Sequence, residues 1–395
     1  VHTAKITFSD NADYTFAISC TDKAGHVAEN SDVKFADGSV ATDKFTVDKT
    51  APVITVSYNN NSAKNNTYFD ADRTAIITIT EHNFDASRVV AEVISENAIG
   101  TVENYAEYLR NPANWTNEGD KHTAKIVYSV DADYKFNISC TDKAGNTNNS
   151  VDYGDAIAPD EFTIDHVDPK KLEISYRQSV FDLVLETITF GFFRSELEVT
   201  IKAADDTSGI SYFTYSIDDG KTYTTIPTSN IRADENGNSY ALFTIKPQHK
   251  GKITFKAFDC AGNFAETSDN KTVVVDSIKP VISVKYDNNT SDENNKSFYN
   301  KARTATITLT DSNFFTEAFD NKHLVITVIR TDDSGKKISS VIKNTDLTVP
   351  FKNGSGDKHT AKLDFVEDGD YTFTIDYTDF SGNKSDRYST SFTID

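Results

Sequence analysis

Residues 133–146 read DYKFNISCTDKAGN, and close copies of this stretch recur along the chain. Residues 13–25 read DYTFAISCTDKAG, residues 370–383 read DYTFTIDYTDFSGN, and residues 253–263 carry the looser copy ITFKAFDCAGN. In each copy apolar side chains alternate with polar ones, which is the period of two expected of a strand with one buried face. Four copies a little over a hundred residues apart indicate a tandem array and not one large domain.

Composition and charge narrow the possible classes of function. The 395 residues include 60 acidic and 40 basic side chains, which gives a formal net charge of −20 at pH 7. Such a chain repels a phosphate backbone, so we expect no nucleic-acid partner. No apolar run approaches the ~20 residues needed to span a bilayer, so we expect no membrane insertion of this segment. The chain contains no methionine, and we expect it to be an excised or mature segment.

The three cysteines do not form a disulfide framework. Cys20 and Cys140 occupy the same position in two copies of the repeat, whereas Cys260 lies at a different one. One cysteine per repeat cannot close a disulfide within a domain, and no CxxC pair is present. We therefore expect Cys20 and Cys140 to be small, buried, apolar side chains.

A second repeated phrase marks the start of each unit. It reads ITVSY at 54–58, LEISY at 172–176 and ISVKY at 282–286. An aspartate followed four residues later by a proline precedes each phrase, at Asp48 to Pro52, Asp165 to Pro169 and Asp276 to Pro280. These junctions predict three whole units, 50–167, a divergent 168–277, and 278–395.

The first residues match only the later part of a unit. His2-Thr-Ala-Lys-Ile repeats at His122 and, with Leu for Ile, at His359, both deep inside their units. We therefore expect residues 1–49 to be the C-terminal half of a domain, completed by further sequence or by another chain, because an unmatched apolar strand face promotes aggregation.

The repeated phrases fit the strands of an immunoglobulin-like (Ig-like) sandwich. Tyr14, Tyr134 and Tyr371 each follow an acidic turn, as a tyrosine corner does, and the glycine that follows each strand suits a left-handed hairpin position. The whole chain resembles the bacterial Ig-like repeats of large, adhesin-type cell-surface proteins. The predicted fold is all-β, with tandem Ig-like β-sandwiches arranged end to end.

Catalytic motifs are missing from the sequence. The eight histidines show no HExxH spacing, and His2, His122 and His359 recur at equivalent positions, as structural residues would. There is no Gly-x-Ser-x-Gly elbow and no phosphate-binding glycine loop. We expect no enzymatic activity and no catalytic residues.

Calcium is the one cofactor to weigh. The resemblance implies that Ca²⁺ can bind at domain junctions, where aspartates recur at positions 22, 48, 142, 165, 259, 276 and 379. The alternative, which we favour, is that these aspartates cap turns by themselves, so that no cofactor and no metal ligand is needed.

Two segments depart from the strand pattern and are candidate ligand-binding surfaces. In residues 100–116, helical spacing follows Thr101 as a possible cap and stops at Pro112, and the functional reading makes Tyr105, Tyr108 and Trp115 interface anchors. The other reading is a short helix that packs on its own sandwich, with Trp115 sealing the edge.

The second segment is the apolar run 179–193 of the divergent unit. It supplies Phe181, Leu185 and Phe192 as candidate ligand-binding residues if the run is partly exposed. The other reading is that the run covers the open end of its own core.

The function expected is that of a non-catalytic segment of a bacterial cell-surface adhesin, located outside the cell, which presents Ig-like domains to a host extracellular protein or glycoprotein. One alternative is a host-immunoglobulin-binding surface protein that resembles B-cell superantigens. Another alternative is a passive stalk of spacer repeats.

Overall fold

The structure is a computed structural model that describes residues 2–29, 34, 38, 44–177, 190–290, 297–320 and 322–395. The chain divides into two compact units. The first comprises Val1–Lys170, Asp205–Ser211 and Phe258–Phe264, and the second comprises Lys171–Ala204, Tyr212–Ala257 and Ala265–Asp395.

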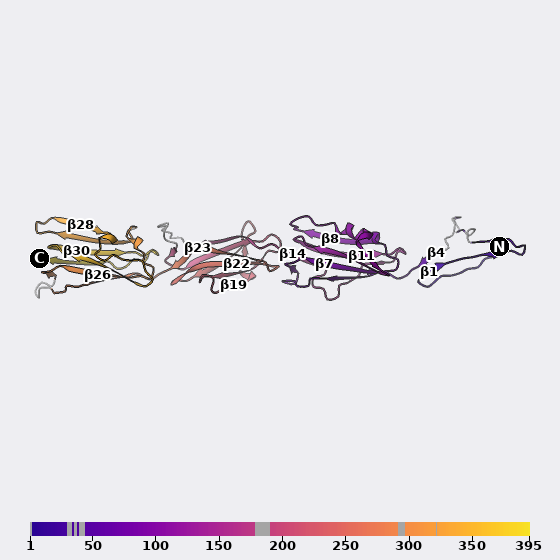
Figure 1. Ribbon diagram of the computed structural model, residues 1–395, viewed down its shortest axis with the longest axis horizontal. Helices are drawn as coiled ribbons and strands as arrows, with labels where there is room; N and C mark the ends of the chain where they lie inside the picture. Colours follow the sequence, from indigo (N-terminus) through magenta and orange to yellow (C-terminus); the bar gives the residue numbers. More distant parts are fainter. Residues whose placement is uncertain are drawn as a thin grey trace. The chain divides into compact units, whose positions relative to one another are not determined.

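The N-terminal part of the first unit contains two short antiparallel pairs (Figure 1). β1 (Ala12–Thr15) pairs with β4 (Lys44–Val47), and β2 (Cys20–Thr21) pairs with β3 (Val27–Ala28). The Tyr14 hydroxyl donates to the Asp10 carbonyl oxygen (3.0 Å), as in a tyrosine corner.

Residues 50–167 form two facing sheets. The first has the order β13 (Val151–Asp152), β5 (Val53–Tyr58), β7 (Arg73–Thr80), β10 (Lys121–Tyr128), β9 (Thr116–Glu118). The second has the order β12 (Thr147–Asn148), β11 (Ala132–Thr141), β14 (Glu161–Ile164), β6 (Tyr68–Phe69), and β8 (Val89–Glu96) also pairs with β11. β6 runs parallel to β14. The β7–β10 and β8–β11 pairs are antiparallel.

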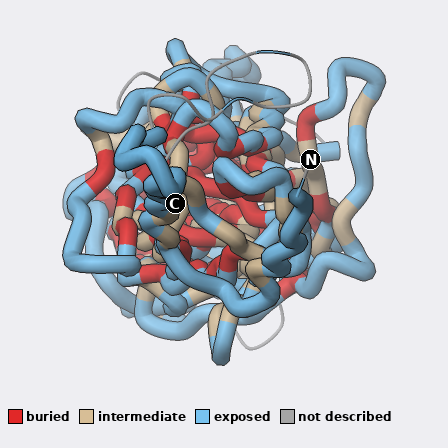
Figure 2. Tube along the Cα trace, turned by 90° about the vertical axis from the view of Figure 1, so that its right-hand side faces the viewer, coloured by how far each residue is buried: buried red, intermediate tan, exposed pale blue. Residues whose placement is uncertain are grey.

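Strict alternation of side chains builds this core. Along β7 the alternation buries Ala75, Ile77 and Ile79, while the residues between them, Ile76 and Thr78, are only half-buried. In Figure 2 buried positions are red and exposed ones pale blue, and the two are interspersed along the trace. Because burial of each Ile or Val side chain stabilises the fold by about 1.5–3 kcal/mol, the repeated alternation is enough to fix which face of each strand points inward.

A short helix, α1 (Tyr105–Arg110), lies within this sandwich, with 3-10 turns η2 (Ala86–Arg88) and η3 (Pro112–Asn114) beside it. The helix begins later than the sequence predicted. Asn104 and not Thr101 caps it, because the Asn104 side chain accepts a hydrogen bond from the Glu107 amide (3.2 Å).

The strands of 168–277 also form two sheets. One has the order β15 (Lys170–Tyr176), β17 (Leu197–Ala204), β21 (Ser239–Ile245), β20 (Arg232–Ala233). The other has the order β16 (Phe190–Phe193), β23 (Phe264–Val275), β22 (His249–Asp259), β18 (Ile210–Ser216), β19 (Thr224–Ile226), and η4 (Thr228–Asn230) follows β19.

The strands of 278–395 repeat the plan of 50–167. One sheet has the order β24 (Val281–Tyr286), β26 (Arg303–Thr310), β29 (Lys358–Phe365). The other has the order β25 (Phe298–Tyr299), β31 (Tyr388–Ile394), β30 (Gly369–Tyr377), β27 (Leu324–Thr331), β28 (Lys337–Ile342), and the 3-10 turns are η5 (Thr316–Ala318) and η6 (Asn344–Asp346). β25 is parallel to β31, as β6 is to β14.

The predicted all-β fold of Ig-like sandwiches is confirmed. Tyr134 and Tyr371 donate to the carbonyl oxygens four residues earlier (2.8 and 2.7 Å), which completes the tyrosine corners. One expectation about the cysteines was wrong: Cys140 is buried, but Cys20 is exposed in β2, whose only strand partner among the described residues is β3. Within the described residues, no helix has the length and apolar character that a membrane crossing requires.

Candidate functional site

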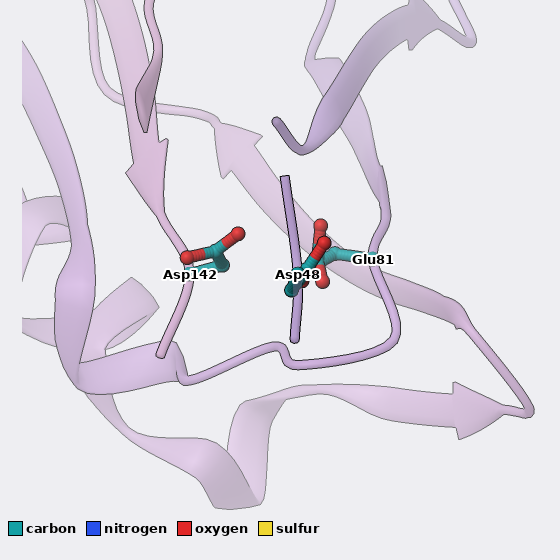
Figure 3. Close-up of side chains that lie close together, drawn as sticks. All are labelled: Asp48, Glu81 and Asp142. Atoms are coloured by element: carbon teal, nitrogen blue, oxygen red, sulfur yellow. The ribbon is translucent and has the colours of Figure 1, made fainter. Parts of the chain in front are cut away.

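Three carboxylates meet where the N-terminal part joins the sandwich of 50–167. Asp48 lies between β4 and β5, Glu81 directly follows β7, and Asp142 directly follows β11 (Figure 3). One side-chain oxygen from each lies within 4.8 Å of the others, and Glu81 and Asp142 are buried. The chain thus brings together negative charges that are far apart in sequence.

Two asparagines hold this first junction together. Asn83 donates through Nδ2 to Asp48 Oδ2 (2.8 Å) and through its amide to Glu81 Oε1 (2.6 Å). Asn146 donates through Nδ2 both to Asp142 Oδ2 (2.8 Å) and to the carbonyl oxygen of Asp48 (3.2 Å). Asn146 therefore ties a hairpin of the sandwich to the linker that precedes the sandwich.

The second junction repeats this arrangement with Asp165, Asp205 and Asp259. Their carboxylate oxygens also lie within 4.8 Å of one another. Asn263 donates through Nδ2 to the Asp165 carbonyl oxygen (3.0 Å) and to Asp259 Oδ2 (2.9 Å). The Ser208 amide takes the part that Asn83 Nδ2 plays in the first junction, because it donates to Asp165 Oδ2 (3.1 Å).

The third junction lies in the second unit and is the most buried. Asn383 donates through Nδ2 to the Asp276 carbonyl oxygen (2.8 Å) and to Asp379 Oδ2 (2.9 Å). Asn313 donates through Nδ2 to Asp276 Oδ2 (2.9 Å) and through its amide to Asp311 Oδ1 (2.8 Å). Here the Tyr377 hydroxyl donates to the remaining Asp311 oxygen.

The local sequence explains why each hairpin presents its asparagine. In the stretch Asp-x-x-Gly-Asn, the first carboxylate accepts the amide of the last residue, at 2.9 Å for Asp142 and 2.7 Å for Asp379. The turn needs a left-handed residue, which Gly145 (φ 96°) and Gly382 (φ 83°) supply. This Asx-type turn fixes the asparagine side chain toward the linker.

Burial disfavours the charged form of these carboxylates. Desolvation raises the pKa of Asp259 to about 6 and that of Asp379 to about 7, and the nearby carboxylates add to both shifts. Burial also raises the pKa values of Glu81, Asp165 and Asp311. None of the ion pairs found in the described ranges involves a carboxylate of the three junctions.

A cavity of about 450 Å³ adjoins the first junction. His82 lies at its wall, with Nδ1 2.9 Å from Asp120 Oδ1 and Nε2 3.3 Å from Asp13 Oδ2. Hydrogen bonds to these two carboxylates raise the pKa of His82. Since Asp13 belongs to β1, this exposed histidine is a second link between the N-terminal part and the sandwich.

The sequence identified two of the three carboxylates at each junction. Six of the seven predicted aspartates come together in pairs, whereas Asp22 stays exposed in a hairpin where His26 replaces the asparagine. Sequence reasoning missed Glu81, Asp205 and Asp311. Each of them could have been found as the acidic residue directly after a strand with Ile-Thr or Lys-Ala alternation. These strands are β7, β17 and β26, in the same order.

The first two junctions partly fit a hard cation. Calcium takes six to eight oxygen ligands, and three carboxylates with no basic partner supply a large share of them. However, most of the carboxylate oxygens already accept hydrogen bonds from asparagine and backbone N–H groups. Turn capping without a metal therefore stays the prediction for these junctions, and calcium binding stays its alternative.

The candidate residues of the 100–116 segment are packing residues in this structure. Tyr105 is buried and its hydroxyl donates to the Val127 carbonyl oxygen (2.6 Å). Trp115 is buried, donates through Nε1 to the Leu109 carbonyl oxygen (2.7 Å), and lies 4.9 Å from the Phe84 ring. Tyr108 is half-buried and packs against the same core. The geometry favours the reading in which this helix seals its own sandwich.

The candidates of the 179–193 run divide into two groups. Phe181 and Leu185 lie outside the described residues. Phe192 is buried and belongs to the core cluster of 278–395, where its ring lies 5.4 Å from Phe380. This side chain joins two consecutive sandwiches and is not open to a ligand.

Recurrent histidines have structural positions. His122 stacks on Phe84 at 4.2 Å, with Nε2 2.8 Å from the Glu81 carbonyl oxygen. His359 repeats this with Phe314 at 4.8 Å and the Asp311 carbonyl oxygen at 3.0 Å. Both rings therefore brace the residue that supplies the third carboxylate of a junction.

Comparisons with solved structures find proteins of low similarity to this chain. The chain resembles a tetra-tandem repeat from the extending region of a large adhesion protein, with 16% identity over 98% of this chain and 93% of that chain and a TM-score of 0.34. It also resembles fibronectin(III)-like modules of Clostridium thermocellum CbhA (14% identity, 56% of this chain and 94% of that chain, TM-score 0.20) and bovine butyrophilin (10% identity, 55% and 97%, TM-score 0.28).

The chain matches no protein-family model and no curated protein. None of the three TM-scores reaches 0.5, so the assignment to Ig-like sandwiches rests on the strand pairing and the tyrosine corners described above.

Proposed function

We propose that the chain is a non-catalytic segment of an extracellular bacterial surface protein of the adhesin type, in which consecutive Ig-like domains with boundaries near 50, 168 and 278 are held by braced junctions. The observation that supports this proposal is the threefold repetition of one brace. Asn146, Asn263 and Asn383 each bond the carbonyl oxygen of the linker aspartate that precedes their domain. A chain whose function is to hold domains at a fixed spacing needs the same linker contact at each domain boundary.

The stalk reading is favoured by the burial of the candidate anchors. Tyr105, Trp115 and Phe192 are all used for packing, so the strongest aromatic candidates for a host ligand are already occupied. On this reading the segment spaces a binding surface from the cell envelope, and the host protein or glycoprotein is recognised by a surface that these residues do not form.

Small-angle scattering tests the brace. The full chain carrying Asn146→Ala, Asn263→Ala and Asn383→Ala together is expected to give a broader distribution of intramolecular distances than the unchanged chain, because each linker loses its tie. The matched control is the triple replacement of exposed asparagines that make no such tie, Asn149→Ala, Asn236→Ala and Asn300→Ala. Indistinguishable scattering from the braced and unbraced chains would remove the basis of the proposal.

A binding assay separates presentation from spacing. The immobilised full chain is tested against purified immunoglobulin G and purified mucin. Saturable binding by either supports a binding segment. No binding at micromolar concentrations leaves the stalk function as the supported one.

A further inference from the structure

One sheet of 278–395 ends in an exposed strand. Among the described residues, β28 pairs only with β27. Residues 337–341 of this strand are all exposed, and they include Ile338 at 38% and Val341 at 66%. A strand at the edge of a sheet presents unpaired backbone groups and both faces of its side chains to a partner. β28 is therefore the most accessible strand of its domain for a contact with another molecule.

The other domain of the same plan has no such strand at this place. β8 and β27 are equivalent, since Val89 faces Cys140 and Leu324 faces Tyr377 in the two strand registers. β28 follows β27 in the chain, whereas the helix α1, which packs on the core, follows β8. The exposed strand is thus a specific feature of 278–395 and not a general property of the repeat.

The charged side chains next to β28 are basic. They are Lys336, Lys337 and Lys343, and all three are exposed. No ion pair found among the described residues involves any of these lysines. The turn before the strand carries Asp332 and Asp333, and Asp332 Oδ1 accepts the amide of Lys336 (3.0 Å). We call residues 336–343 the basic strand.

The acidic charge of the chain is concentrated in another domain. Residues 50–167 contain 18 acidic and 8 basic side chains, a formal net charge of −10, whereas residues 278–395 contain 18 and 15, a net charge of −3. Repulsion between the net charges of two molecules is largely screened beyond about 10 Å at 0.1 M salt. The charges that face one another locally therefore decide whether two copies attract.

Part of this acidic charge lies on the outer face of the sheet that contains β8, β11 and β14. Four exposed residues of β8 alternate there with less exposed ones, and they are Val90, Glu92, Ile94 and Glu96. Glu161 of β14 lies on the same face, because Lys135 of β11 faces both Ile94 and Glu161. We call Val90, Glu92, Ile94, Glu96 and Glu161 the acidic face.

The acidic face has charges and apolar groups that are open to a partner. Glu161 pairs with Lys135 Nζ (2.7 Å), whereas Glu92 and Glu96 enter none of the ion pairs in the part of the chain that the structure describes. The two apolar residues of the face are 52% and 40% exposed. A hollow of about 540 Å³ lies beside them, lined by Glu92, Ile94 and Glu161 among others.

This acidic character is specific to 50–167. By the strand registers, the three glutamates of the acidic face correspond in 278–395 to Thr327, Thr331 and Ser391. One complete domain therefore carries an acidic sheet face and the other carries an exposed basic strand. Each surface combines a single sign of charge with exposed aliphatic side chains, so the two are complementary.

We propose that the basic strand of one molecule docks on the acidic face of a second copy of this chain. The lysines lie against the glutamates, and Val341 lies against the exposed aliphatic side chains of the face. Charge complementarity sets the specificity and the rate of association, and burial of the aliphatic groups adds affinity. Because each molecule carries one strand and one face, association either closes reciprocally in a pair or continues along a series of molecules.

This association goes beyond the proposed stalk function. Neither surface includes a residue of the three junctions, so the scattering test of the brace and the test of self-association fail or succeed separately.

Sedimentation equilibrium of the full chain in 0.1 M salt tests the proposal. We expect the weight-average mass to rise with concentration between about 1 and 100 μM, as for a small, transient interface. One variant carries Glu92→Lys and Glu96→Lys, and another carries Lys337→Glu and Lys343→Glu. Each is expected to weaken association at least about tenfold, because like charges then face each other. The first variant should do so although it lowers the net negative charge.

A charge swap makes the test specific. The chain with all four changes is expected to regain association, because an acidic strand then meets a basic face. Two control pairs change the net charge equally at exposed positions outside both surfaces, Glu103→Lys with Glu118→Lys and Lys358→Glu with Lys362→Glu. They must leave association unchanged. Equal melting temperatures show that all variants are folded.

Three results would overturn the proposal. In the first, the unchanged chain sediments as a monomer up to about 100 μM. In the second, the variants of the face and of the strand associate as the unchanged chain does. In the third, Lys337→Glu with Lys343→Glu strengthens association, which would mean that the lysines protect an edge strand from pairing.

Discussion

Replacing Asn383 by alanine is the sharpest probe of a junction. Asn383 is 1% exposed, and its Nδ2 group makes two hydrogen bonds, one to the neutral Asp276 carbonyl oxygen and one to the Asp379 carboxylate. A neutral hydrogen bond contributes about 1 kcal/mol and a bond to a charged group about 1.5–3 kcal/mol. We expect Asn383→Ala to lower the free energy of unfolding of residues 278–395 by about 3 kcal/mol at pH 8.

The loss is expected to depend on pH. Folded Asp379 has a pKa of about 7, so at pH 8 it is mostly ionised and at pH 5 it is mostly protonated. Below pH 7 the second hydrogen bond is then a neutral one, and the expected loss falls to about 2 kcal/mol. The difference identifies the carboxylate as the partner that matters.

Hydrogen exchange of β30 measures this loss within the right domain. Three kcal/mol corresponds to about 100-fold faster exchange of its protected amides at pH 8. Asn146→Ala, at a half-buried position of the first junction, is expected to have a smaller effect on 50–167, and the exposed Asn300→Ala should have none. Equal effects of Asn383→Ala and Asn300→Ala would refute the reasoning, as would a loss that grows toward low pH.

Three further outcomes are expected. The stability of 278–395 should fall as pH rises from about 4 to 7. The folded pKa of Asp379 (about 7) exceeds the unfolded value of 3.8, so the folded state binds an extra proton in this range. Thermal denaturation should show the fall in stability, and Asp379→Asn should reduce that fall. Calcium, if it binds the first two junctions, should raise the free energy of unfolding of the adjoining domains by mass action, by about 2.7 kcal/mol at one hundred times the dissociation constant, and so raise their melting temperature; identical melting with calcium and with a chelator would dismiss the metal. Trp115→Ala should destabilise 50–167 by about 3–5 kcal/mol in calorimetry, and a stable variant that loses ligand binding instead would restore Trp115 as an interface anchor.

The strands could be predicted because each rests on a local pattern. Alternation in 133–141 sets which side chains of β11 point inward, and the glycine of the next turn fixes its end, so neither depends on distant residues. The start of α1 was misplaced because Thr101 and Asn104 are both good caps by type, and only the packing of Tyr105 on Tyr128 (5.4 Å) decides between them.

The junctions were only partly predictable because their carboxylates come from three separate segments. The linker aspartates and the hairpin aspartates repeat in recognisable phrases, so their pairing could be expected. Glu81 and Asp311 stand at equivalent positions but are different residue types, so they do not recur as one phrase. Each also follows a strand whose other end lies far from the junction. Cys20 shows the opposite case: its sequence context matches that of Cys140, but burial depends on a facing sheet, and the described part of residues 1–49 contains only the β1–β4 and β2–β3 pairs.

The parallel pairing of β6 with β14, and of β25 with β31, bears on how these sandwiches carry mechanical load. β14 and β31 are the last strands of their domains, and their partners lie near the beginning. A force that pulls the two ends of a domain apart slides such strands past each other, so that their hydrogen bonds and the Phe162 or Phe392 side chains resist together and do not open one by one. Resistance to force is governed by the unfolding rate and not by equilibrium stability. A domain of this design can therefore withstand tension even where its net stability is ordinary.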